Sequence, residues 1–461
     1  MRVLLILPDG HVHKIRIGGF VRSMREAPLT LTTLAALAPK DLNISFRLID
    51  ESIDAVPLDY KADLVGISVL TGTAVRAYTL ARHFRLRGIP VVLGGVHVTI
   101  MPEETARHAD SIVVGPAEIT WPQLLRDFSQ GHLGEVYKDD SPSNEWLTNI
   151  PTPRRDLQRS NGYMISNTVM ATRGCQHTCE FCTVPVVWLG YAKRQVRDVI
   201  RDIQSMSGRL LTFNDVSLVD DVDYAKELFT AMIPLKRRWG GLATVRVADD
   251  PELLELLVRS GCRYLLIGFE SFSQPALKEI HKSFNREEDY KSLMEALHSY
   301  GISVQGTFMF GFDSDDASIF EATVERVIDL KVDIPRYSIL TPYPGTGLYR
   351  RLLAEKRLLS CNWQDYDTMH VVFQPAKMSP DELYRGFKWV YRETFKIPHI
   401  MRRTFSLGFA GPVNFVGNLT YKRFVRQLYN DERYAKPFSL TSTSEAAPAN
   451  EQTLEKPTWH V

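Results

Sequence analysis

The sequence contains little cysteine, with five in 461 residues. This small, odd number excludes a disulfide-stapled secreted scaffold and indicates a reducing compartment. The sequence also lacks an excess of charge of either sign, since 55 Lys and Arg stand against 54 Asp and Glu. This balance excludes a basic domain built mainly on phosphate contacts, and we expect no nucleic-acid partner.

Long apolar runs are absent as well. No stretch reaches the roughly 18 residues of a membrane-spanning helix, so we expect no transmembrane segment. The apolar run at 3–7 is too short for the core of a signal peptide. The strongest remaining membrane candidate, 405–416, is broken by glycines and a proline and supports at most an interfacial contact. We therefore expect a cytoplasmic protein, with peripheral membrane contact left open.

Short apolar runs alternate with helical stretches along most of the chain, whose length corresponds to about three domains. In the first third, this alternation is typical of a parallel sheet covered on both faces. The expected strands there are 3–7, 44–49, 64–69, 90–93 and 112–114. Six further repeats suit a barrel or part-barrel, which carries its chemistry at the carboxyl ends of the strands. The expected strands there are 165–171, 210–213, 242–245, 264–269, 304–310 and 337–340.

Three of the five cysteines stand in the motif TRGCQHTCEFC, as Cys175, Cys179 and Cys182. A structural zinc site needs four closed ligands, and the other cysteines, Cys262 and Cys361, lie far along the chain. Three thiolates on a [4Fe–4S] cluster would leave one iron free for a substrate or cofactor. The spacing therefore favours an iron–sulfur cluster over zinc and over a disulfide.

Around these cysteines the chain resembles the radical S-adenosylmethionine (SAM) superfamily, whose signature has the same spacing. The resemblance implies a [4Fe–4S] cluster and SAM as cofactors. It also implies SAM contacts by Phe181 before the third cysteine, by Asp215 after the second strand, and by Glu270 and Ser271 after the fourth. Many relatives carry two adjacent acids where this chain has only Asp215, which is a departure from the family pattern.

The first domain lacks G-x-G-x-x-G after its first strand, which argues against a nicotinamide cofactor. The segments GISVLTGT, VVLGGVHVT and VVGPAE follow successive strands instead. They resemble the cobalamin-binding domain attached to one large class of radical SAM enzymes. The resemblance implies cobalamin as a further cofactor, with contacts from Ser68, Leu70, Gly94, Gly95, His97 and Glu118.

One element of that resemblance is incomplete. Many cobalamin domains carry D-x-H-x-x-G, in which the histidine binds cobalt. Here Asp9 and His11 begin the motif, but Lys14 occupies the glycine position. Whether His11 ligates cobalt therefore stays open, and His97 is expected to contact the nucleotide tail of cobalamin.

Together these patterns and resemblances predict an α/β protein with five parts. A Rossmann-like cobalamin-binding domain occupies 1–138, and a linker occupies 139–162. A (β/α)6 partial TIM barrel, the radical SAM domain, occupies 163–360. A helical C-terminal domain follows at 361–440, where Ser379 and Pro380 mark a helix start, and residues 441–461 have the composition of a disordered tail.

The resemblance implies a cobalamin-dependent radical SAM methyltransferase that acts on an unactivated carbon of a small-molecule or lipid substrate. An electron donor such as flavodoxin or ferredoxin is implied as a partner. Two alternatives stay open: a cyclase or ring-contraction enzyme with the same cofactors, and a non-catalytic iron–sulfur or cobalamin sensor. The motifs describe cofactors rather than the substrate, so they assign no residue to the chemical step.

Overall fold

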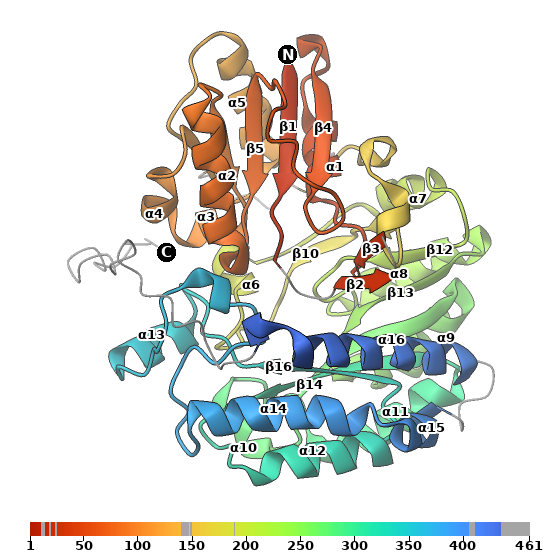
Figure 1. The fold of residues 1–461 in the computed structure, drawn as a ribbon. Helices are drawn as coiled ribbons and strands as arrows, with labels where there is room; N and C mark the ends of the chain where they lie inside the picture. Colours follow the sequence, from red (N-terminus) through yellow and green to blue (C-terminus); the bar gives the residue numbers. More distant parts are fainter. Residues whose placement is uncertain are drawn as a thin grey trace.

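The computed structural model describes residues 1–10, 14–17, 20–23, 25–139, 147, 150–188, 190–404 and 411–434. Two six-stranded sheets organise this part of the chain, and Figure 1 shows the first, near the N-terminus, above the second. His11, residues 405–410 and the expected tail 441–461 lie outside the described residues. Within the described residues, no helix is long and apolar enough to cross a membrane.

The first sheet is parallel throughout, with the strand order β4-β1-β5-β6-β7-β8. Its strands are β1 (Arg2–Leu7), β4 (Ser45–Asp50), β5 (Leu64–Ser68), β6 (Val91–Gly94), β7 (Ser111–Val114) and β8 (Val136–Lys138). The five expected strands are confirmed to within two residues, and β8 is an addition that the sequence did not indicate.

Helices cover both faces of this sheet, as the apolar strands predict. They are α1 (Thr30–Leu37), α2 (Ala74–Leu86), α3 (Val96–Ile100), α4 (Pro102–Ala106) and α5 (Ala117–Ser129). Alternate residues of β1 serve the two faces, since Val3 and Leu5 pack with α1 and α5 while Leu4 and Ile6 pack with α2. All four are fully buried, so this strand is the centre of the first core.

The order of the first sheet reverses at β1, which lies between β4 and β5. Ligands of open parallel sheets bind beyond the carboxyl ends of the strands, at such a switch point. Figure 1 shows these ends directed toward the second sheet. A ligand of the first sheet would therefore lie between the two sheets.

The second sheet is also parallel, in the order β16-β15-β14-β13-β12-β9. Its strands are β9 (Thr168–Val169), β12 (Leu210–Phe213), β13 (Arg238–Ala243), β14 (Cys262–Glu270), β15 (Ser303–Phe310) and β16 (Ile334–Ile339). Among the described residues, β9 and β16 are outer strands with no pairing between them. The expected part-barrel is therefore confirmed, open along one side.

Helices follow the strands of the second sheet. They are α7 (Val196–Gln204), α8 (Val222–Met232), α9 (Pro251–Ser260), α10 (Gln274–Glu279), α11 (Tyr290–Ser299), α12 (Ser318–Asp329) and α13 (Gly347–Ala354). The strand residues that face these helices pack with them into the largest apolar core. The alternate strand residues line the opposite, inner surface of the curved sheet.

Three expected strands of this series differ from the structure, and the one expected at 337–340 is β16, which begins three residues earlier. The stretch 165–171 divides into β9 and the separate strand β10 (Thr172–Gly174). The strand expected at 242–245 is β13, which begins four residues earlier and contains Gly240 and Gly241. Glycine weakens a strand signal, but a Cβ on Gly240 would lie 1.9 Å from the ring of Tyr264. The glycine that obscured the pattern makes room for this tyrosine.

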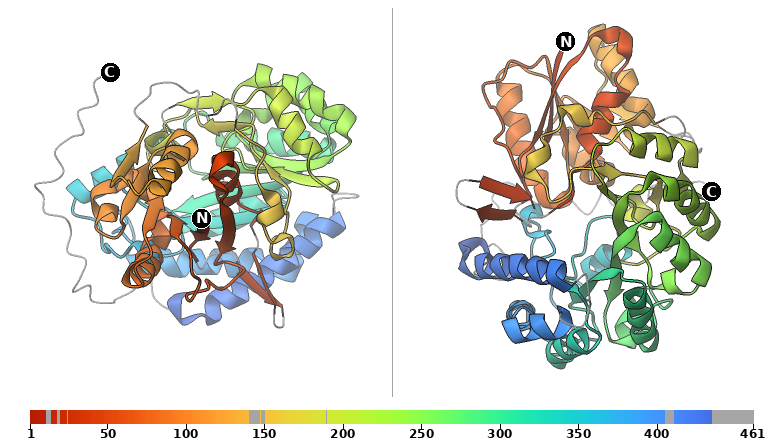
Figure 2. Two further views of the ribbon diagram at one scale, coloured as in Figure 1. Left: turned by 90° about the horizontal axis from the view of Figure 1, so that it is seen from above. Right: turned by 90° about the vertical axis from the view of Figure 1, so that its right-hand side faces the viewer.

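The C-terminal part is helical, as expected, with α14 (Pro380–Thr394), α15 (Ile397–Thr404) and α16 (Gly411–Asn430). Ser379 is confirmed as the N-cap of α14, since its hydroxyl accepts a hydrogen bond from the Glu382 amide while Glu382 accepts one from the Ser379 amide. A short antiparallel hairpin of β2 (Lys14–Ile17) and β3 (Phe20–Ser23) contacts α16. Figure 2 shows the hairpin projecting over that helix.

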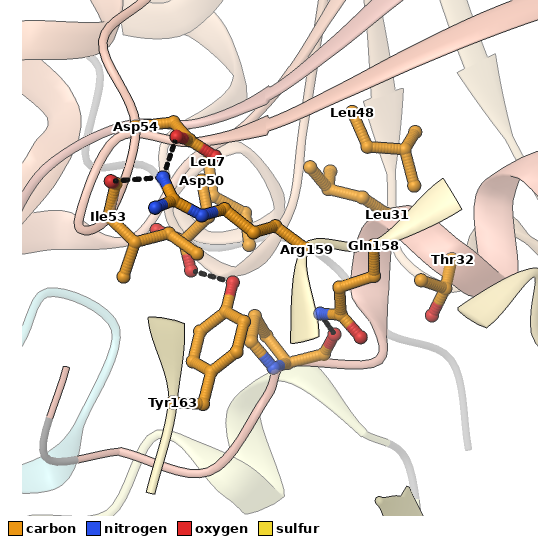
Figure 3. A pocket seen from close by; sticks show the side chains of 11 residues that line it. Leu7, Leu31, Thr32, Leu48, Asp50, Ile53, Asp54, Gln158, Arg159 and Tyr163 are labelled. Carbon is orange, nitrogen blue, oxygen red and sulfur yellow. Dashed lines mark hydrogen bonds and ion pairs between the residues drawn. The ribbon is translucent and has the colours of Figure 1, made fainter. Parts of the chain in front are cut away.

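The expected linker is held against the first sheet in its described part. Arg159 pairs with Asp54 in the loop after β4, and Tyr163, the first residue after the expected linker, donates a hydrogen bond of 2.8 Å to Asp50 at the end of β4. Figure 3 shows both contacts around a small pocket beside Leu7 and Leu31. The described residues at the end of this segment are therefore packed against the first sheet.

Candidate active site

The three cysteines lie on a loop between β10 and β11 (Tyr191–Lys193), which pair as a two-stranded ribbon. The loop carries the short helix α6 (Val184–Val187). Gly174, immediately before Cys175, has a φ of +87°, and a Cβ there would lie 1.9 Å from the carbonyl oxygen of Gly190. The backbone therefore closes tightly at the base of the loop, and only glycine fits there.

The thiols fit a metal cluster by their surroundings. All three are free and partly accessible. The amide N–H groups of His177 and Val184 donate to the sulfurs of Cys175 and Cys182, each at 3.4 Å. Burial raises the pKa of Cys175 and of Cys179 to about 11. Since thiols must lose their protons to bind a metal, amide donors directed at the sulfurs stabilise the form that the cluster requires.

Two further side chains that could bind a metal lie close to Cys175, and the sequence analysis missed both. Ligand atoms of Cys175, His177 and Asp220 lie within 4.8 Å of one another. Asp220 belongs to the loop after β12, and it is followed by Asp221, which caps α8 and pairs with Lys193. The two adjacent acids that many relatives carry at the position of Asp215 therefore stand five residues later in this chain, as Asp220 and Asp221.

Asp215 supports the cysteine loop from below. Its carboxylate accepts hydrogen bonds from the amides of Ala171 and Thr172 and from the Thr172 hydroxyl, at 2.7 Å for the hydroxyl. The residue is 1 % exposed, and burial raises its pKa to about 6. These hydrogen bonds engage the carboxylate within the protein, and the expected SAM contact of Asp215 stays a prediction. The hydrogen bonds of Asp215 fix the backbone at the start of β10.

Glu270 lies at the carboxyl end of β14, where the sequence predicted it, and forms a buried ion pair. Lys282 reaches its carboxylate at 2.6 Å, and both side chains are 11 % exposed. Glu270 has a φ of +65° beside an irregularity in the pairing of β14 with β15. The charge of Lys282 lowers the pKa of Cys179, although burial of the thiol dominates. The pair therefore lies next to the cysteine loop.

The neighbours of this pair have defined contacts. The Ser271 hydroxyl accepts a hydrogen bond from the Ser273 amide at 3.0 Å. Phe181 is partly buried against the main apolar core. Between Cys179 and Phe181, Glu180 pairs with Arg351 of α13. These contacts hold the loop on the barrel, and they leave SAM binding by Phe181, Glu270 and Ser271 as a prediction.

The glycine pair of the first sheet forms a narrow turn at the end of β6. Gly94 is the last residue of β6, and Gly95 has a φ of +104°. A Cβ on Gly95 would lie 2.9 Å from the backbone nitrogen and oxygen of Val69. Ser68 and Leu70 flank this point, and Leu70 is 48 % exposed. A bare backbone edge next to accessible side chains fits the close approach of a bulky cofactor such as cobalamin.

Replacing Gly95 by alanine is expected to lower the free energy of unfolding by about 2–4 kcal/mol, because left-handed strain and the clash with Val69 add. The matched control is Gly88→Ala, which has a φ of +72° but no neighbour within 4 Å of a Cβ. That variant should lose only about 1 kcal/mol. Thermal unfolding measures both, and equal losses would contradict the close contact at Gly95.

His97 lies buried at the end of the first sheet. Its ring is fully buried, with one nitrogen 3.3 Å from the Thr71 hydroxyl and the other 3.1 Å from that of Tyr78. Glu104 accepts hydrogen bonds from Tyr78 and from Trp363. Both ring nitrogens are thus engaged within the protein, and the expected contact of His97 with the nucleotide tail stays a prediction. The ring belongs to a polar network that joins the first sheet to the C-terminal part.

Glu118, at the start of α5, connects the two sheets, and its expected contact with cobalamin stays a prediction. One carboxylate oxygen pairs with Arg173 of β10 at 2.6 Å, with side-chain exposures of 8 % and 15 %. The other oxygen is buried and has no hydrogen-bond partner among the described residues. The Arg173 guanidinium lies 4.7 Å above the Trp188 ring. Glu118 therefore couples the first sheet to the cysteine loop.

Comparisons with known proteins agree with this arrangement. Residues 169–327 match the family model of the Radical SAM superfamily, and residues 20–125 match that of the B12 binding domain. The chain is 31 % identical over 444 residues to the bacteriochlorophyllide d C-12(1)-methyltransferase of Chlorobaculum tepidum, covering 92 % of this chain and 93 % of the relative.

A more distant relative and a solved structure extend the comparison. The anaerobic magnesium-protoporphyrin IX monomethyl ester cyclase of Cereibacter sphaeroides is 23 % identical over 66 % of this chain and 55 % of its own length. The methyltransferase TsrM of Kitasatospora setae, solved with cobalamin and a [4Fe–4S] cluster, superposes with a TM-score of 0.67 at 15 % identity. The match covers 93 % of this chain and all of that one, so the two share their fold.

Proposed function

Because the chain belongs to the cobalamin-dependent radical SAM enzymes, we propose that it transfers a methyl group to an unactivated carbon of a small-molecule substrate. The observation that carries the proposal is the placement of the three-cysteine loop opposite the carboxyl ends of the first sheet. Two cofactors bound there would face each other across one space, as a transfer between them requires.

When bound, the [4Fe–4S] cluster and SAM supply a 5′-deoxyadenosyl radical, and cobalamin supplies the methyl group. The residues of this chain bind and orient these groups. Cys175, Cys179 and Cys182 would hold the cluster. Lys282 and Glu270 set the charge beside it, and Gly95 lets the backbone approach cobalamin. The ion pair of Glu118 with Arg173 holds the first sheet and the cysteine loop together.

The proposed substrate is a chlorophyll-type macrocycle. The relative that is 31 % identical over most of the chain is named for a methyl transfer to bacteriochlorophyllide d, and this similarity supports the same class here. A lipid substrate has weaker support, because the hopanoid C-2 methylase of Rhodopseudomonas palustris is 24 % identical. The proposal includes a small electron-transfer protein, such as flavodoxin or ferredoxin, as the reductant.

A second candidate, ring formation without methyl transfer, is favoured by the similarity to the magnesium-protoporphyrin cyclase. Both reactions would use the same cysteine loop and the same first sheet. The non-catalytic sensor has no comparable support, since the relatives that cover most of the chain are enzymes.

The coproducts of SAM distinguish these functions. The reconstituted enzyme is incubated without oxygen with SAM, bacteriochlorophyllide d and a chemical reductant. Methyl transfer should yield S-adenosylhomocysteine and 5′-deoxyadenosine in equal amounts, because one SAM donates the methyl group and another the radical. Deoxyadenosine without S-adenosylhomocysteine would support the cyclase function and contradict methyl transfer.

A further inference from the structure

Six basic side chains surround a hollow at the amino ends of three strands of the second sheet. The hollow has a volume of about 240 Å³ and lies where β12, β13 and β14 begin. Its basic lining residues are Arg209, Lys236, Arg237, Arg238, Arg259 and Arg263. Among the described residues that line it, none is acidic. The hollow therefore concentrates positive charge on a chain whose net charge is only +1.

Backbone hydrogen bonds hold the three segments of the hollow side by side. The Arg238 amide donates to the carbonyl oxygen of Arg209 at 2.7 Å. The Trp239 amide donates to the carbonyl oxygen of Gly261 at 3.0 Å. A Cβ on Gly261, whose φ is +99°, would lie 1.9 Å from the carbonyl oxygen of Arg237. Since neighbouring strands lie about 4.8 Å apart, the backbones of the three segments fall within roughly 10 Å of one another.

The positive charges of the hollow have little acidic compensation. Among the residues that the structure describes, no ion pair involves Arg209, Lys236, Arg237, Arg238 or Arg263. The guanidiniums of Arg237 and Arg263 donate to backbone carbonyl oxygens instead. These acceptors are neutral, so they fix the two guanidiniums without cancelling their charge.

Arg259 has an acidic partner, but the pair lies in water. Its guanidinium is 3.4 Å from Glu255, and more than half of each side chain is exposed. Exposed pairs of this kind contribute little. The segments that form the hollow, 205–210, 233–238 and 258–263, contain no Asp or Glu. The cations therefore repel one another, and an anion from outside the chain would relieve that repulsion.

The hollow is separate from the candidate active site. Strand β14 begins at Cys262, beside the hollow, and ends at Glu270, beside the cysteine loop. Its nine residues, at about 3.3 Å each, place the two ends roughly 26 Å apart. A ligand bound in the hollow would therefore contact neither the cluster nor SAM.

We propose that this hollow binds a phosphate group of an anionic ligand. Guanidinium groups bind phosphate oxygens through paired, charge-assisted hydrogen bonds, and the Lys236 ammonium adds a point charge. Several cations around one concavity suit a multiply charged anion better than a single carboxylate. They also suit a compact group better than nucleic acid, whose binding needs an extended basic stripe or face.

The distance from the cysteine loop makes this inference independent of the proposed methyl transfer, because the ligand would take no part in the reaction. A phosphate group reaches such a hollow either on a small molecule in solution or as the headgroup of a lipid. The chemistry of recognition is the same in both cases, and the two arms of the test separate the sources.

The test measures binding of inorganic pyrophosphate to the reconstituted holoenzyme by calorimetry without oxygen. The salt concentration is about 0.15 M, where attraction between distant charges is largely screened. The hollow variant is Arg209→Gln/Arg238→Gln, which changes two exposed side chains. The matched control, Arg82→Gln/Arg107→Gln, removes two exposed arginines of the first domain. A second arm measures sedimentation of the same proteins with vesicles of phosphatidylglycerol and phosphatidylcholine.

The unmodified enzyme should bind one pyrophosphate per chain. The hollow variant should bind it at least about tenfold more weakly, as the loss of one charge-assisted hydrogen bond predicts. The control should bind it like the unmodified enzyme. Equal weakening in the two double variants, or no binding in either arm, would overturn the inference.

The vesicle arm identifies the source of the phosphate group. Vesicle binding that is lost in the hollow variant but kept in the control would assign the hollow to a lipid headgroup. Pyrophosphate binding without vesicle binding would assign it to a ligand in solution. Vesicle binding that the hollow variant retains, without pyrophosphate binding, would also overturn the inference. Melting temperatures identify a misfolded variant, and the exposed single replacement Lys236→Gln then takes the place of the double variant.

Discussion

The variant Cys175→Ala is expected to bind no stable iron–sulfur cluster and to form 5′-deoxyadenosine only at background level. Three thiols are available on the loop, and a cluster that keeps one iron for SAM needs all of them. Iron and sulfide content after anaerobic reconstitution and the yield of deoxyadenosine measure the effect. Cys179→Ala and Cys182→Ala should behave in the same way.

The matched control is Cys361→Ser. Cys361 is exposed and lies outside the cysteine loop, so this variant should keep the iron content and activity of the unmodified enzyme. If Cys175→Ala retained the full complement of iron, the assignment of the loop as the cluster site would be wrong. If Cys361→Ser lost a defined share of iron, Cys361 would have to be counted as a fourth ligand of the cluster.

The variant Lys282→Met is expected to lower the free energy of unfolding by about 3–5 kcal/mol, because it leaves the Glu270 carboxylate buried without its partner. The double variant Lys282→Met/Glu270→Gln removes that uncompensated charge and should recover much of the loss. Urea unfolding of the cluster-free protein measures both, so that cluster content does not enter the comparison.

A surface pair provides the control for this prediction. Lys226 bridges Asp250 and Glu252, with 23 % of its side chain exposed against 30 % and 70 % for the acids. Ion pairs in contact with water contribute little to stability, so Lys226→Met should cost much less than Lys282→Met. Equal losses for Lys282→Met and Lys226→Met would show that the pair beside the cysteine loop is not buried in solution.

Apolar periodicity was sufficient to predict both sheets, and the three cysteines stand in a loop after the first strand of the second sheet, as the motif indicated. Each expected strand of the first sheet lies between helices, as β1 shows by sending alternate residues to opposite faces. The position of β13 could not be predicted, because Gly240 serves the ring of Tyr264, which is distant in sequence. A contact of this kind leaves no local pattern.

The side-chain roles were harder to predict than the backbone. His97 and Asp215 stand in the expected segments, but the hydroxyls of Thr71 and Tyr78 and the amides of Ala171 and Thr172 occupy their polar atoms. A motif gives the position of a residue and not its partners. For Lys282, no motif marks its contact with Glu270, which forms only when the loop after β14 folds back.

The most direct measurement of the central claim, methyl transfer to an unactivated carbon, follows the methyl group itself. The enzyme is supplied without oxygen with SAM that carries a trideuterated methyl group, together with bacteriochlorophyllide d and a reductant, and the pigment is analysed by mass spectrometry. The account predicts a product heavier by one trideuterated methyl group in place of a hydrogen. Formation of 5′-deoxyadenosine with a changed pigment that carries no deuterium would contradict it.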